Sequence, residues 1–206
     1  MIGILNGVIF AIIAGVVVQF WFEQMDLSIL IGVSMILNMI VAGLFGILVP
    51  VSLKKFNNED LSKLKDLNYK ELATEIIYLY SSDFISKEEL SSLINKSYST
   101  FREKEVVKLS NVGEIKLLEL FHGPTLAFKD VAMQFIGNLY EYYLSKNDKK
   151  INIVVATSGD TGAAAIDAIK GKSNLNILVL HPNNRISSVQ RKIMTTVEEK
   201  NVFNIA

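Results

Sequence analysis

The sequence predicts an α/β domain preceded by a two-helix transmembrane hairpin, and three observations lead to this fold class. All 21 lysines and arginines lie after residue 53, whereas residues 1–53 carry only two charged side chains, Glu23 and Asp26. Two long uncharged stretches flank this acidic pair. Further along, β-rich runs alternate with segments of helical periodicity, which is typical of a parallel sheet with crossover helices. We therefore expect a hairpin over residues 1–55 and an α/β domain over residues 57–206.

The predicted hairpin consists of Ile2–Phe22 and Leu27–Leu53. These stretches are 21 and 27 residues long, and about 20 apolar residues suffice to cross the hydrocarbon core of a bilayer. Lys54 and Lys55 follow the second stretch, so the positive-inside rule places residues 54–206 in the cytoplasm. The alternative is a helical pair buried in a water-soluble protein, and the length and the lack of charge argue against it. We therefore expect a membrane protein that is attached through residues 1–53. Small residues recur every four positions in the first stretch, which lets helices pack closely in lipid: Gly3, Gly7, Ala11 and Gly15.

The residues after Asn57 are charged, and their pattern predicts two amphipathic helices. Apolar residues recur at helical spacing over Leu61–Tyr80 and again over Lys87–Phe101. Ser86 is a suitable N-cap for the second helix, because Glu89 stands three residues later and completes a capping box. Both helices precede the predicted sheet.

Lys129 is the first candidate functional residue. The short apolar run Ile115–Phe121 predicts a buried strand, and Gly123-Pro124-Thr125 interrupts it. A helix over Phe128–Ser145 follows, so Lys129 would lie in its first turn, where unpaired backbone N–H groups disfavour a cation. A lysine that forms a Schiff base with an aldehyde cofactor would explain this position, because a poorly solvated amine loses its proton more easily. The alternative is a surface lysine beside Asp130.

The second candidate is a loop rich in glycine and hydroxyl groups. Ile151–Ala156 predicts a strand, and Ala163–Lys170 predicts a helix. A strand, such a loop and a helix together can cradle an anion, because glycines allow close approach and the helix N-terminus supplies donors. The alternative is an N-capped turn that only satisfies backbone donors, and the residues alone do not decide between the two. The loop consists of Thr157, Ser158, Gly159, Asp160, Thr161 and Gly162.

The C-terminal part continues the alternation of strands and helices. Leu175–His181 predicts a second buried strand, Val189–Lys200 a helix with a polar face, and the chain then stops within what reads as another strand at Asn204–Ala206. Parallel strands with right-handed crossovers are expected from this order. We interpret His181, at the end of its strand, as a packing or loop residue.

The composition excludes several kinds of site. The chain contains no cysteine, so it can form neither a disulfide nor a thiolate metal site, and it has only two histidines, His122 and His181. Its formal net charge is zero, and no basic excess indicates nucleic acid. We expect no metal site and no nucleic-acid partner, and the sequence leaves the oligomeric state open.

Two long motifs resemble threonine synthase, a pyridoxal-phosphate enzyme of the tryptophan-synthase-β type, fold type II. They are Glu119-Leu-Phe-His-Gly-Pro-Thr-Leu-Ala-Phe-Lys-Asp130 and Ala156-Thr-Ser-Gly-Asp-Thr-Gly-Ala-Ala164. The resemblance extends over about residues 59–206 and includes Arg185–Thr196, where Ser188 stands in place of an expected proline. It indicates the N-terminal portion of such an enzyme.

This resemblance implies a reaction and a role for each candidate residue. Threonine synthases convert O-phosphohomoserine and water into threonine and phosphate, with pyridoxal 5'-phosphate (PLP) as the cofactor, and they are lyases acting on phosphates. The resemblance implies that Lys129 is catalytic and carries PLP as a Schiff base, and that Thr157–Gly162 hold the anionic end of the substrate. His122 could face the cofactor. The family's loop for the cofactor phosphate lies further along than residue 206, so we expect an incomplete chain that is inactive alone.

The first 56 residues resemble two consecutive membrane helices of MgtE-type magnesium transporters. The resemblance lies in Leu5-Asn-Gly7 and in the run from Gly32 to Gly43, ending at Leu48-Val-Pro50. Asn6 and Asn38 are the polar residues of interest, because buried amides in lipid either bridge helices or serve a function. The family's following helix is not present, so two spans alone are not expected to form a magnesium pore.

Three hypotheses about function therefore compete. The chain is part of a threonine synthase, or a fragment of a magnesium transporter, or a non-functional chimeric or truncated product. The threonine synthase motifs are longer and cover more of the chain, so we favour that class.

Overall fold

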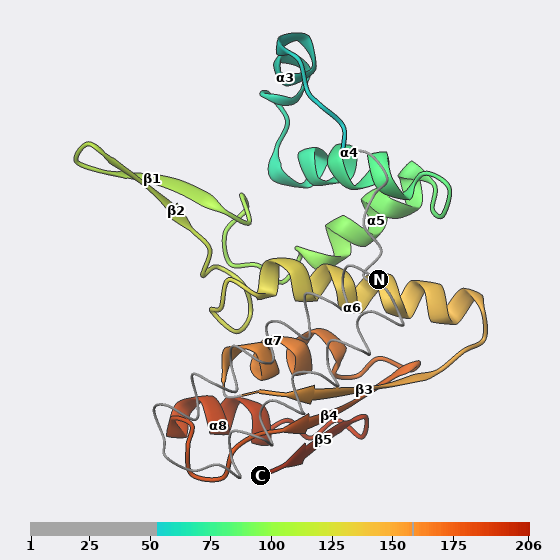
Figure 1. Ribbon diagram of the computed structural model, residues 1–206, viewed down its shortest axis with the longest axis vertical. Helices are drawn as coiled ribbons and strands as arrows, with labels where there is room; N and C mark the ends of the chain where they lie inside the picture. The colour runs from blue at the N-terminus through green and yellow to red at the C-terminus, as the bar shows by residue number, and fades with distance from the viewer. Residues whose placement is uncertain (1–52, 158) are drawn as a thin grey trace, which may run out of the picture. The chain divides into compact units, whose positions relative to one another are not determined.

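The computed structural model describes residues 53–157 and 159–206 (Figure 1). The predicted transmembrane hairpin lies outside the described residues. Among the residues that are described, no helix has the length and apolar character needed to span a bilayer. The helices are α3 Asn58–Leu64, α4 Tyr69–Ser81, α5 Lys87–Ser97, α6 Asp130–Lys146, α7 Asp160–Ile169 and α8 Ser188–Thr195, and the strands are β1 Lys108–Val112, β2 Ile115–Glu119, β3 Ile151–Ala156, β4 Leu175–Leu180 and β5 Val202–Ile205.

The region predicted as one helix over Leu61–Tyr80 is two helices. A second N-cap causes the break, because the Asn68 side chain accepts hydrogen bonds from the backbone N–H groups of Lys70 and Glu71 and so starts α4. The predicted capping box of α5 is present: the Ser86 side chain accepts from the backbone of Glu89, and the Glu89 carboxylate accepts from the Ser86 backbone.

Helix α5 and the start of α6 share an apolar cluster. Leu90, Ile94 and Val106 are fully buried in it, and Val131 and Phe135 of α6 pack against it. The Tyr98 hydroxyl donates to the backbone oxygen of Val131 across 3.0 Å. The cluster therefore fixes the first turns of α6 from one side, which is the part of the helix that begins at the candidate lysine.

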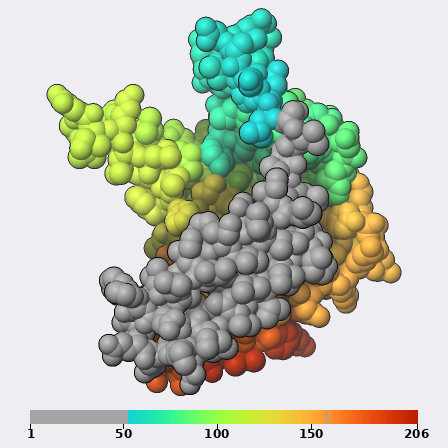
Figure 2. Space-filling view, viewed as in Figure 1, coloured from blue at the N-terminus to red at the C-terminus, as the bar shows by residue number. Residues whose placement is uncertain are grey.

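The strand predicted over Ile115–Phe121 exists, but the prediction that it is buried was wrong. It is β2, which pairs only with the antiparallel strand β1 in a two-stranded sheet within the described residues. Gly113, with φ of +62°, forms the turn between them. Ile115 is 70% exposed, and Figure 2 shows the hairpin standing clear of the neighbouring helices. An apolar run of this length does not distinguish a buried strand from an exposed hairpin.

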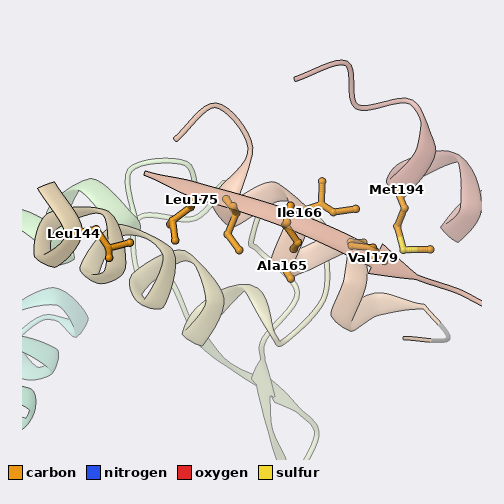
Figure 3. Close-up of a cluster of buried hydrophobic side chains, with 9 residues drawn as sticks. Leu144, Ala165, Ile166, Leu175, Val179 and Met194 are labelled. Carbon is orange, nitrogen blue, oxygen red and sulfur yellow. The ribbon is translucent and has the colours of Figure 1, made fainter. Parts of the chain in front are cut away.

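The parallel sheet is confirmed, with the strand order β3, β4, β5. Ile153 is paired with Ile177, and Ile177 with Val202, so each strand lies beside the strand that precedes it in the chain. Helices α6, α7 and α8 contribute Leu144, Ile166 and Met194 to one core with the inward side chains of the sheet (Figure 3). The inward side chains of β4 are Leu175, Ile177 and Val179, all almost fully buried.

The opposite face of this sheet is exposed in the described part of the chain. Val154 of β3 is 63% exposed and Phe203 of β5 is 51% exposed. The crossover helices α7 and α8 both lie on the other, inward face of the sheet.

Helix α7 begins at Asp160, three residues before the predicted start at Ala163, and α8 ends at Thr195, five residues before the predicted end at Lys200.

Candidate active site

Lys129 lies immediately before α6, at the carboxyl end of the parallel sheet. Its backbone has right-handed helical angles, and its oxygen accepts the N–H of Met133 across 2.9 Å. Helix α6 leads into β3 through a short turn and runs antiparallel to it (Figure 1). The start of α6 and the end of β3 are therefore at the same end of the sheet. Ligands bind at this end in open α/β folds.

The Lys129 side chain is half-buried and forms no ion pair with the described residues. Its ammonium nitrogen lies 4.3 Å from the centre of the Phe128 ring. A cation held only against an aromatic face can leave that position at small cost, because such contacts contribute about 0.5–1 kcal/mol at exposed sites.

Asp130 is not an exposed neighbour of Lys129, as the surface-pair alternative requires. It is 0% exposed, and its carboxylate accepts two hydrogen bonds from Thr125, one from the backbone N–H at 2.8 Å and one from the hydroxyl at 2.7 Å. Burial raises the pKa of Asp130. The turn before α6 is thus closed by a buried carboxylate.

The loop from Thr157 to Gly162 joins β3 to α7, and Thr157 organises it. The Thr157 hydroxyl accepts the backbone N–H groups of Gly159, at 3.3 Å, and of Gly162, at 3.1 Å. Two amides that could contact an anion are therefore satisfied by a side chain, as the N-capped alternative describes. An anion would reach these amides by displacing the threonine hydroxyl. Ser158 lies outside the described residues.

Two further loop residues have different neighbours. Asp160 is exposed and accepts the side-chain amide of Gln190 on α8, at 2.7 Å. Thr161 is half-buried and lines an apolar groove between α6, β3 and α7. The loop therefore does not present all six predicted residues to a single ligand position.

The glycines of the loop permit close packing. A Cβ at Gly162 would collide with the Thr157 side chain and lie 2.7 Å from the sulfur of Met194. A Cβ at Gly159 would lie 2.7 Å from the Gln190 amide nitrogen. The side chains of α8 are thus packed against the loop, and Gly162, whose added Cβ would meet the short Thr157 side chain, is the position where glycine matters most.

His122 is held by Glu119. Its Nε2 lies 2.7 Å from a carboxylate oxygen of Glu119, whose other oxygen accepts the hydroxyl of Ser110. The Ser110 hydroxyl and then His122 lower the pKa of Glu119. The carboxylate fixes the imidazole orientation just before the turn that leads to Lys129. His181 is buried at the end of β4, and its backbone N–H bonds to Ile205, in agreement with a packing role.

A side-chain hydrogen bond joins α6, which follows Lys129, to α7, which follows the Thr157–Gly162 loop. Gln134 of α6 donates its amide to the Asp167 carboxylate of α7 at 2.8 Å. Lys129 forms no hydrogen bond with the described residues of the Thr157–Gly162 loop. The structure therefore brings the lysine and the loop to one end of the sheet without direct contact.

Sequence reasoning missed Gln190 and the burial of Asp130. The N-cap position of Ser187, whose hydroxyl accepts the backbone N–H of Gln190, was a local signal for where α8 begins. No local signal indicates that Gln190 reaches Asp160, because 30 residues separate them.

The parallel sheet, its crossover helices and the lysine and loop at its carboxyl end define an α/β domain suited to ligand binding at that end. Residues 31–98 match the family model described as threonine synthase N terminus, and residues 1–60 match the model MgtE, described as divalent cation transporter. The two matches overlap at residues 31–60. The threonine synthase match therefore begins before Glu59, the residue from which the resemblance was expected to extend.

Curated and solved threonine synthases are similar to this chain. The threonine synthase of Eremothecium gossypii is 43% identical over 176 residues, which are 78% of this chain and 34% of that protein. The crystal structure of threonine synthase from yeast has a TM-score of 0.74 and 40% identity, covering 78% of this chain and 35% of the other. A structure titled PLP-bound threonine synthase from Brucella melitensis has a TM-score of 0.71 and 38% identity, covering 76% and 34%.

The described residues are therefore similar in sequence and fold to part of these threonine synthases, and the family model that matches residues 31–98 is that of the threonine synthase N terminus. The chain spans about a third of the length of the relatives it matches. The α/β fold expected from the motifs is confirmed.

Proposed function

We propose that this chain contributes the lysine-bearing part of a PLP-dependent threonine synthase. In this proposal Lys129 binds PLP covalently, and the Thr157–Gly162 loop holds the anionic end of O-phosphohomoserine. The observation that supports it is the position of Lys129 immediately before α6, whose start lies at the same end of the parallel sheet as the end of β3 (Figure 1).

The residues present fit an aldehyde cofactor. Lys129 would hold the cofactor through its amine, whose nitrogen lies 4.3 Å from the centre of the Phe128 ring. PLP, when bound, supplies an electron sink for carbanion chemistry. Lys129 then holds and moves a proton at its Nζ, and the loop orients the substrate through its hydroxyls and backbone N–H groups.

The loop has a capped and an open state in this proposal. Thr157 satisfies the amides of Gly159 and Gly162 while no anion is bound. An anionic substrate group replaces the threonine hydroxyl at these amides, and the hydroxyl then donates to the same group. Because the helix N-terminus favours negative charge, this exchange keeps every donor satisfied.

Covalent trapping tests the role of Lys129. The full chain, in detergent, is incubated with PLP, reduced with borohydride and digested, and the modified lysines are identified by mass. We expect the adduct at Lys129 in preference to the other lysines, and we expect it to disappear in Lys129→Arg. Lys63→Arg is the matched control, because Lys63 is exposed and pairs only with Glu59. Equal modification of many lysines, unchanged by Lys129→Arg, would contradict the proposal.

We also propose, as a second function, that residues 1–53 attach the chain to a membrane with residues 54–206 on the cytoplasmic side. The match of residues 1–60 to a divalent cation transporter model supports this. The scarcity of charge supports it too, because residues 1–53 contain only two charged side chains. We expect the chain to remain with membranes after carbonate washing. Release by carbonate would oppose the proposal, and Mg²⁺ flux in liposomes that depends on residues 1–53 would extend it to transport.

A further inference from the structure

A charged side chain is completely buried next to the candidate lysine. Asp130 is 0% exposed, although aspartate is seldom fully buried unless it is paired. Its partners are both on Thr125, which lies five residues earlier in the turn. The carboxylate therefore joins the turn of residues 123–127 to the first residue of α6.

The turn is shaped to receive this carboxylate. A Cβ at Gly123 would collide with the Cβ and Oδ2 atoms of Asp130. The backbone N–H of Asp130 bonds to Ala127 at 3.0 Å, and that of Leu126 bonds to Gly123 at 3.2 Å. Leu126 has a φ of +63°, a left-handed conformation that non-glycine residues seldom adopt. Its retention indicates that the surrounding bonds determine the path of the turn.

The carboxylate is retained at an energetic cost. Burial raises the pKa of Asp130, the Thr125 hydrogen bonds oppose that effect, and the carboxylate of Asp167 adds to it. An asparagine or an apolar residue would avoid burying a charge. The side-chain hydrogen bonds of the buried Asp130 carboxylate are both to Thr125, in the turn of residues 123–127. A role in fixing the path of this turn would explain why a carboxylate stands at this position.

We propose that Asp130 is a positioning residue, which fixes the direction of the Lys129 side chain by holding the 123–127 turn against α6. The inference rests on the proposed function of Lys129. Lys129 lies between two fixed points, because Thr125 anchors Asp130 and the backbone oxygen of Lys129 accepts Met133. These hydrogen bonds restrain the backbone of Lys129 on both sides and so set the direction in which its side chain leaves the backbone.

The test removes one donor and leaves the carboxylate in place. Thr125→Val deletes the hydroxyl bond to Asp130, whereas Thr125→Ser keeps it. In the full chain treated with PLP and borohydride, we expect Thr125→Val to lower the yield of adduct at Lys129 about tenfold, which corresponds to one hydrogen bond, and Thr125→Ser to restore it. Thr74→Val is the matched control, because it removes a threonine hydroxyl bond within α4.

The readouts separate positioning from general destabilisation. We expect Thr125→Val and Thr74→Val both to lower the midpoint of thermal unfolding, but only Thr125→Val to lower adduct yield and to speed amide hydrogen exchange at residues 126–130. An unchanged yield and unchanged exchange in folded Thr125→Val would overturn the positioning role while leaving the function of Lys129 intact. Absence of the adduct in the unmodified chain would overturn both proposals.

Discussion

The side-chain amide of Gln190 donates to the carboxylate of Asp160 across 2.7 Å and so connects the first turn of α8 to the first turn of α7. The Ser187 hydroxyl also donates to Gln190. We predict that Gln190→Ala lowers the free energy of unfolding by about 1 kcal/mol, the usual contribution of such a hydrogen bond. Denaturant unfolding of the full chain measures this.

A second substitution at Gln190 tests whether its contact with the Asp160 carboxylate affects stability. Gln190→Glu should destabilise more than Gln190→Ala at neutral pH, because it places a carboxylate beside Asp160. Arg191→Ala is the control on the exposed side of α8 and should have little effect. Equal stability of the Ala and Glu variants would show that the contact with Asp160 is unimportant.

We predict that any side chain at Gly162 lowers the stability of the fold, because the neighbouring side chains leave no room for a Cβ. Gly162→Ala should destabilise by about 1–3 kcal/mol through overpacking, although alanine favours a helix, because the added methyl collides with the Thr157 side chain. Thr157→Ser removes the colliding methyl group but keeps the hydroxyl that caps α7. The double variant should therefore recover part of the loss in a thermal unfolding experiment. A fully additive loss would argue against this collision.

Leu126 offers a test of strain in the turn before α6. Its φ of +63° is costly for a side chain with a Cβ, by roughly 1–2 kcal/mol, and the side chain is 53% exposed. We predict that Leu126→Gly is neutral or stabilising, and that the β-branched Leu126→Val is destabilising. Chemical denaturation of both variants checks the order. Stability that follows side-chain size instead would show that packing outweighs backbone strain.

Glu89 should make stability depend on pH. The Lys146 ammonium, followed by Tyr142, lowers the pKa of Glu89 to about 2 from 4.5. A carboxylate with a depressed pKa in the folded state stabilises above its unfolded pKa, and that stabilisation is lost as the pH falls towards 2. The stability difference between the unmodified chain and Glu89→Gln should therefore be constant above pH 5 and shrink between about pH 4.5 and pH 2. Thermal unfolding at several pH values measures it, and a difference that does not change with pH would contradict the role of this carboxylate.

The elements with strong local signals could be predicted from the sequence. Helix α6 was expected over Phe128–Ser145 and is Asp130–Lys146, because Val131, Phe135 and Leu139 repeat at helical spacing. The strands β3 and β4 are each within one residue of their predicted ends. Periodicity and hydrophobic runs are properties of neighbouring residues, so they survive without knowledge of the tertiary structure.

Tertiary contacts could not be predicted in the same way. Strand β1 was missed because Lys108–Val112 has only a weak alternation, and it becomes a strand by pairing with β2. In the candidate site, Lys129 was predicted from its motif and its role stays a prediction, whereas the burial of Asp130 depends on the folding of the 123–127 turn around it. The contact of Gln190 with Asp160 depends on the packing of α8.

The strand order has a consequence for synthesis. Each strand of the parallel sheet pairs with the strand made just before it, through one helix. Because domains tend to fold as they leave the ribosome and short-range contacts close fastest, β3 and β4 can associate while later residues are still being translated. This topology allows the carboxyl ends of β3 and β4, with the β3–α7 loop, to come together before β5 is made, and β5 then adds to the free edge of β4.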